Sequence, residues 1–92
     1  MTDFSTCLAE ALRRVTDDLE VAELRAPQAD TDVFALVDSL VIVNLLLESE
    51  MMLEQETGNY VPLADETLFD AAKSPLRNWS RWVAYVGERH GR

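Results

Sequence analysis

Asp38 and Ser39 are the adjacent residues of this sequence that are best placed to do chemistry. They precede Leu40 and the apolar run VIVNLLL of residues 41–47. The carboxylate of Asp38 can cap a helix by accepting hydrogen bonds from the backbone N–H groups of its first turn. Ser39 would then occupy the first helical position with its hydroxyl half exposed. A phosphate ester on that hydroxyl would lie at the positive end of the helix dipole, where anions are stabilised.

Other reactive residues are few. His90 is the single histidine, and it falls near the end of the sequence. No pair of carboxylates converges on a recognisable pocket. Ser39 therefore lacks the base that a catalytic nucleophile needs. Cys7 is the single cysteine, which excludes an internal disulfide and a zinc cluster and favours a small core thiol. We therefore expect a protein that is not an enzyme and holds no metal.

Length and charge restrict the class of protein further. The 92 residues are enough for one small domain, with an ordered part over about residues 4–86 and a tail over residues 87–92. The formal net charge of −9 argues against binding to nucleic acid and suits partners with basic patches. The sequence does not open like a signal peptide, and the apolar run is too short to span a bilayer. We expect a cytoplasmic monomer.

The first half of the chain predicts one helix and a long loop before the Asp-Ser pair. Apolar residues recur at helical spacing over residues 4–19, with Thr2 or Asp3 as the N-cap. Over residues 21–37 this pattern breaks down, which indicates a loop pinned where its apolar residues reach the core. The next helix should run over residues 38–56 and end at Gly58, which can adopt the left-handed conformation.

The helix expected over residues 38–56 has two apolar faces. At 100° per residue, the core side carries Ile42, Leu45, Leu46, Ser49, Met52 and Leu53. A soluble monomer rarely exposes several large apolar side chains on the opposite face of a helix unless a partner covers them. We therefore predict a partner-docking face with an acidic edge, made of Leu40, Asn44, Leu47, Glu48, Met51 and Glu54. The alternative is a helix that is buried on all sides or in a dimer.

Two more helices complete the expected bundle. A short helix over residues 64–69 should turn Leu68 and Phe69 inward. Ser74 followed by Pro75 is a sharp helix start, so the last helix should run over residues 75–86. Its buried stripe would be Leu76, Trp79, Val83 and Val86, flanked by Trp82 and Tyr85. The predicted fold is therefore all-α, a small bundle of four helices with a short third one.

The order of these helices, with Asp38-Ser39-Leu40 at the start of the second, resembles the acyl carrier and peptidyl carrier proteins over nearly the whole chain. The segment Leu63-Ala64-Asp65-Glu66 and the later Lys73-Ser74-Pro75-Leu76-Arg77 look like those of free-standing carriers. Two departures stand out. Residues 35–37 replace the glycine that usually precedes the Asp-Ser pair, and Asn44 replaces an acid that is common in fatty-acid carriers.

The resemblance implies a four-helix carrier fold and a covalent cofactor. Ser39 would bear 4′-phosphopantetheine, attached by a phosphopantetheinyl transferase with Asp38 helping to position magnesium and coenzyme A. The thiol of the arm would hold an acyl or aminoacyl cargo as a thioester. The cargo would come from a ligase or acyltransferase and pass to a downstream synthase such as a ketosynthase. The change at Asn44 suggests a specialised pathway, for example to a polyketide or nonribosomal peptide.

Two other functions stay open on the sequence alone. The chain could be an unmodified four-helix adaptor that binds or dimerises through the face around Leu40, Leu47 and Met51. It could also be a small enzyme. A gain of one phosphopantetheine on incubation with coenzyme A and a transferase would separate the carrier from both.

Overall fold

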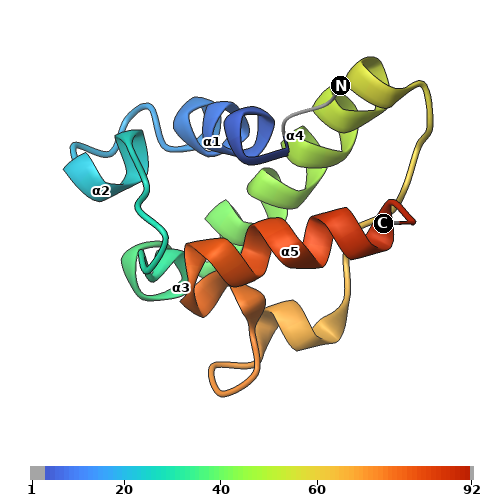
Figure 1. The fold of residues 1–92 in the computed structure, drawn as a ribbon. Helices are drawn as coiled ribbons and strands as arrows, with labels where there is room; N and C mark the ends of the chain where they lie inside the picture. Colours follow the sequence, from blue (N-terminus) through green and yellow to red (C-terminus); the bar gives the residue numbers. More distant parts are fainter. Residues whose placement is uncertain (1–3, 92) are drawn as a thin grey trace.

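The computed structural model describes residues 4–91, and the regular structure in this range is entirely helical (Figure 1). The long helices are α1 (Phe4–Val15), α4 (Ser39–Thr57) and α5 (Trp79–Arg89). Between them lie two four-residue helices, α2 (Ala22–Arg25) and α3 (Val33–Leu36), and two 3-10 turns, η1 (Glu66–Phe69) and η2 (Pro75–Arg77). The predicted all-α class is confirmed. In place of the expected third helix stands the single turn η1.

Both ends of α4 are fixed by local hydrogen bonds. The side chain of Asp38 accepts a hydrogen bond from the backbone N–H of Val41 at 2.9 Å. At the other end Gly58 has a φ of +79°, and its N–H donates to the carbonyl of Glu54 at 2.8 Å. This conformation is strained for residues with a Cβ, so glycine ends the helix here. The predicted bounds of this helix are correct to within one residue at each end.

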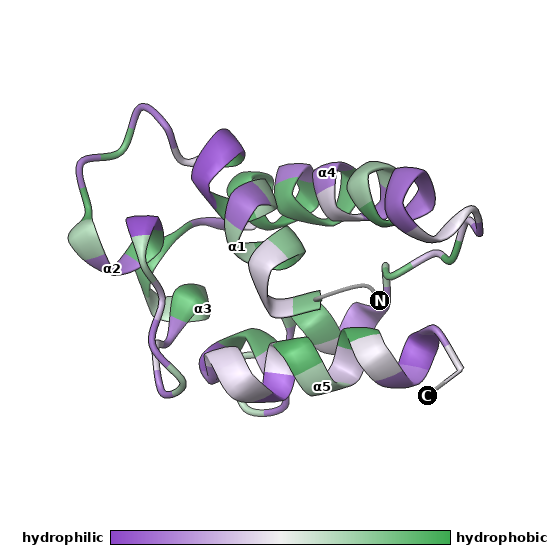
Figure 2. Ribbon diagram, turned by 45° about the horizontal axis from the view of Figure 1, so that its top comes forward, coloured by the Kyte–Doolittle hydropathy of each residue, from purple (hydrophilic) through white to green (hydrophobic). Residues whose placement is uncertain are grey.

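Packing of α1 against the inner face of α4 forms the centre of the core. The two helices run in roughly opposite directions, while α5 follows the direction of α4 (Figures 1 and 2). Leu8 and Leu12 of α1 and Leu45 and Leu53 of α4 are almost completely buried. Of the predicted core face, Met52 alone is only partly buried. The predicted core face of α4 is therefore buried, and it packs against α1.

Helix α1 ends at Val15, earlier than the predicted residue 19. Thr16 turns its hydroxyl back to donate to the carbonyl of Leu12 at 2.7 Å, and the next turn closes with a hydrogen bond from Leu19 N–H to the Thr16 carbonyl. Continuation would also place the acidic residues 17 and 18 at the negative end of the helix dipole, where they are unfavourable. The predicted N-caps, Thr2 and Asp3, lie outside the described residues.

The segment predicted as a long loop contains α2 and α3. Each of these helices contributes one completely buried side chain, Leu24 and Val33 respectively. Asp32 caps α3 by accepting from the N–H of Ala35 at 3.1 Å. A four-residue helix is unstable alone because nucleation is unfavourable, so tertiary contacts must hold both in place. The prediction of a pinned segment is correct, but the prediction that it lacks helices is wrong.

The second half of the chain departs further from prediction. Leu68 is buried as expected, whereas Phe69 is 40% exposed, because successive residues of a single 3-10 turn point in different directions. Pro75 begins only the short turn η2, and a second cap at Asn78, whose side chain accepts from Arg81 N–H, begins α5.

This break at Asn78 changes the face that α5 buries. The extended residue Asn78 interrupts the helix. A helical wheel that starts at Pro75 therefore assigns the wrong faces to the residues after Asn78. Trp82, predicted to flank the stripe, is completely buried, and Val83 is only partly buried. The helix also continues to Arg89, so residues 87–89 are helical and not a tail.

A buried carboxylate ties the extended residues 60–63 to α4. Glu50 is 6% exposed and accepts hydrogen bonds from the hydroxyl of Tyr60 at 2.9 Å and the N–H of Leu63 at 2.7 Å. From α5, the hydroxyl of Tyr85 donates to the carbonyl of Leu63 at 2.8 Å. Both backbone polar groups of Leu63, which is fully buried, are thus paired. The segment is hydrogen-bonded to α4 through Glu50 and to α5 through Tyr85.

Leu46 and Leu47 provide a matched test of the two faces of α4, since they are 3% and 56% exposed. Leu46→Ala should lower the free energy of unfolding by about 2–5 kcal/mol through lost burial and a cavity. The melting temperature should then fall by roughly 10 °C or more. Leu47→Ala should leave melting nearly unchanged. Thermal melts by circular dichroism measure both, and equal destabilisation would contradict the assigned faces.

Candidate functional site

Ser39 is the first residue of α4, and its side chain is exposed, as is that of Asp38. One oxygen of the Asp38 carboxylate is used in the helix cap. Within residues 4–91, no side chain forms a hydrogen bond with the Ser39 hydroxyl. The sequence-predicted pair is therefore brought to the surface at a helix N-terminus, with the hydroxyl accessible to an incoming group.

The chain reaches Ser39 through α3 and Val37. Val37 is extended, with a φ of −133° and a ψ of 163°. Within residues 4–91 positive φ values occur only at Gly58 and Gly91, so residues 35–37 adopt conformations that any L-residue accepts. This explains in physical terms why the turn into α4 needs no glycine here.

An exposed apolar stripe begins next to Ser39 and continues along α4. Leu40 is 67% exposed, Leu47 56% and Met51 54%, and Asn44 lies exposed beside them. Val43, which was not predicted for this face, is also 40% exposed. Leu40, Val43, Leu47 and Met51 are separated by three, four and four residues, which is the spacing of one helix face. This spacing in the sequence already indicated that Val43 belongs to the face. We call Leu40, Val43, Leu47 and Met51 the outer stripe.

The two acids predicted for the docking face differ in their surroundings. Glu54 is exposed. Glu48 is held at the edge toward α1, where its carboxylate accepts from Arg14 at 3.0 Å, and Arg14 also contacts Glu10 at 3.4 Å. Because α4 contains no lysine or arginine, its outer surface remains acidic. The acidic edge therefore consists of one exposed carboxylate and one already paired with an arginine.

The remaining reactive side chains lie elsewhere. Cys7 is buried in the core, and burial raises the pKa of its thiol. His90 follows the end of α5, away from the start of α4, and burial lowers the pKa of its imidazole, whose ring centroid is 5.4 Å from that of Phe4. In the described part of the chain, no three His, Cys, Asp or Glu side chains are grouped to hold a metal ion.

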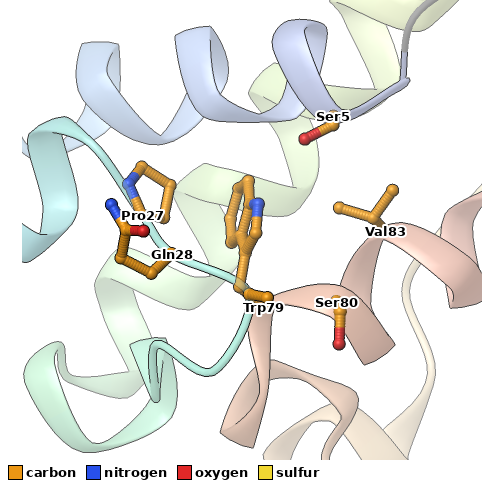
Figure 3. Close-up of a pocket in the computed structure, with 7 residues that line it drawn as sticks. Ser5, Pro27, Gln28, Trp79, Ser80 and Val83 are labelled. Carbon is orange, nitrogen blue, oxygen red and sulfur yellow. The ribbon is translucent and has the colours of Figure 1, made fainter.

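A shallow open hollow of about 320 Å³ lies between the start of α1, the segment before α3 and α5 (Figure 3). Trp79 and Val83 supply apolar surface, and Ser5, Gln28 and Ser80 supply polar groups. Its described lining includes no residue of α4. The hollow is therefore not part of the Ser39 site.

Comparisons with protein families, with curated proteins and with solved structures found no match to this chain. None of the helices within residues 4–91 is long and apolar enough to cross a membrane.

The cap at Asp38 can be tested without reference to function. Asp38→Ala removes the acceptor for the Val41 N–H and should lower the free energy of unfolding by about 1 kcal/mol. Asp38→Asn retains an acceptor oxygen and should change stability by only a few tenths of a kcal/mol, roughly. Urea unfolding of the three proteins measures the difference. If Asn and Ala are equally destabilising, the charge of Asp38 matters more than its hydrogen bond.

Proposed function

We propose that this chain is a carrier protein in which Ser39 bears 4′-phosphopantetheine, whose thiol holds acyl or aminoacyl cargo as a thioester. The observation that supports this most directly is the exposed Ser39 hydroxyl at the first position of a 19-residue helix, immediately after an aspartate cap. A chain of 92 residues with a net charge of −9, whose regular structure over residues 4–91 is entirely helical, is in keeping with such a carrier. In this proposal the chain presents cargo and does not itself catalyse a reaction.

Attachment of the arm is a phosphoryl transfer from coenzyme A. The Oγ of Ser39 forms a bond to the phosphorus of the pantetheine phosphate, and the bond from that phosphorus to adenosine 3′,5′-bisphosphate breaks. The hydroxyl proton passes to a base of the transferase. The product is a phosphodiester anion beside the positive end of the α4 dipole, which stabilises it. The Asp38 oxygen that does not accept from Val41 can help to position magnesium in the transferase complex.

The outer stripe is the proposed contact surface for partner enzymes. It starts at Leu40, next to the arm, so a partner that covers it also meets the cargo. An apolar surface with an acidic edge fits grooves with a basic rim, because complementary charges speed encounter and favour one orientation. The proposed partners are a phosphopantetheinyl transferase, a loading ligase or acyltransferase, and a synthase such as a ketosynthase. We place them in a specialised cytoplasmic pathway.

An unmodified adaptor or dimer remains the second candidate, because the exposed outer stripe could also be the surface through which such a protein binds or dimerises. Leu40 and Leu47 are each more than half exposed, and burying such side chains favours association. Light scattering of the unmodified protein distinguishes the two. A stable dimer that Leu47→Glu converts to a monomer would favour the adaptor.

The arm should attach at Ser39 and nowhere else. Incubation with coenzyme A and a broad-specificity transferase should add the mass of one phosphopantetheine to the wild-type chain, measured by intact mass spectrometry. Ser39→Ala should gain nothing while retaining its melting temperature, since a surface hydroxyl contributes within about 0.5 kcal/mol. Ser80→Ala is the matched control, because Ser80 is an exposed serine in the first turn of α5. Arm gain by the Ser39→Ala protein would refute the assignment.

Binding to these enzymes should weaken as salt rises. Asp38 and Glu54 lie at the two ends of the outer stripe, and at 1 M salt the Debye length falls to about 3 Å, which screens their attraction to basic residues. The KM of the transferase for the carrier should therefore rise between low and high salt. Glu54→Gln should reduce this dependence, while the melting temperature stays nearly constant. A KM independent of salt would mean that apolar contact alone holds the complex.

A further inference from the structure

Arg77 connects the end of η2 to the segment that precedes Ser39. Its Nε donates to the carboxylate of Asp32 at 2.9 Å, and its Nη1 donates to the carbonyl of Ala71 at 2.8 Å. The guanidinium carbon also lies 5.7 Å from the centre of the Phe34 ring, within the range of a cation–π contact. Asp32 and Phe34 belong to the cap and body of α3, so one side chain contacts this helix at two residues.

The Asp32 carboxylate has a double role in this arrangement. One oxygen caps α3 by accepting from the N–H of Ala35, and the other accepts from Arg77. A helix of four residues cannot hold itself together in water. The position of α3 is therefore set by burial of Val33, by packing of Phe34 and Leu36 against the core, and by these contacts with Arg77.

Only Val37 and Asp38 separate the end of α3 from Ser39. A shift of α3 would consequently move the chain that enters α4 and change how the serine is presented. A second link fixes the same region, since the N–H of Ser80 in α5 donates to the carbonyl of Ala29 at 2.9 Å. The geometry points to Arg77 as a positioning residue for attachment of the arm at Ser39. This inference rests on the proposed function of Ser39.

Arginine suits this task because its planar fork can serve two acceptors and stack on a ring at once, whereas lysine offers one point charge. The side chains of Arg77 and Asp32 are 42% and 32% exposed, and exposed ion pairs add little to global stability. Loss of the contact should therefore affect the local placement of α3 more than folding of the bundle.

The experiment measures transfer of phosphopantetheine from coenzyme A to the wild-type chain and to Arg77→Ala, Arg77→Lys and Asp32→Asn. Asp32→Asn keeps an oxygen to cap α3 but presents a donor to Arg77. We expect kcat to fall by about tenfold or more in Arg77→Ala and Asp32→Asn, because a small misplacement of the reacting atom is costly. The KM for the carrier should stay within about twofold, because the outer stripe is unchanged. Arg77→Lys should recover only part of the rate.

Two controls separate positioning from a general structural effect. Arg81→Ala removes another exposed arginine, four residues along the chain, and should leave kcat and KM unchanged. The double variant Asp32→Asn with Arg77→Ala should be no slower than Arg77→Ala alone, because both changes break the same contact. Melting temperatures should fall by no more than about 5 °C.

The outcomes distinguish this inference from the proposed function. If the wild-type chain accepts no arm, the proposed function itself is overturned. If the wild-type chain is loaded and Arg77→Ala and Asp32→Asn are loaded with the same kcat, only the positioning role of Arg77 is overturned. A rate loss matched by Arg81→Ala, or one that appears in KM instead of kcat, would also overturn it. Should Arg77→Ala fail to fold, Asp32→Asn carries the same test.

Discussion

The packing of α1 against the inner face of α4 is the constraint on which the rest of this structure depends. It buries Leu8 and Leu12 together with Leu45 and Leu46, and so fixes how α4 is rotated about its own axis. Once that rotation is set, the outer stripe must face solvent. The exposure of this stripe is therefore a consequence of how the core packs.

Polar side chains hold segments that lie outside the packed long helices. Two segments without long helices, one before α4 and one after it, are each held by a charged residue that lies outside the segment. Arg77 holds α3, and Glu50 holds residues 60–63. Arg77 donates to the side chain of Asp32 and to the carbonyl of Ala71, and Glu50 accepts from the N–H of Leu63 and the hydroxyl of Tyr60. Both charged groups therefore also pair a backbone polar group of an irregular segment. The two contacts give irregular segments a defined position beside the long helices.

The parts of the fold that local signals determine could be predicted from the sequence. The bounds of α4 follow from Asp38, Gly58 and the spacing of leucines between them, and the exposed apolar face follows from the same wheel. The buried Trp82 was missed, because the break at Asn78 resets the helical phase. Arg77 and Glu50 were missed because their partners lie 45 and 13 residues away, and no periodicity reports such pairs.

The absence of basic residues on α4 has an electrical consequence. Glu54 and Glu56 lie near its carboxyl end, where the backbone dipole is already negative, whereas Ser39 lies at its positive end. The negative charge of these side chains and the negative end of the helix dipole thus reinforce each other. The charge of Glu48 is partly offset by Arg14. An approaching cationic surface would feel a torque as well as an attraction, which turns it relative to the helix axis before any apolar side chain is touched.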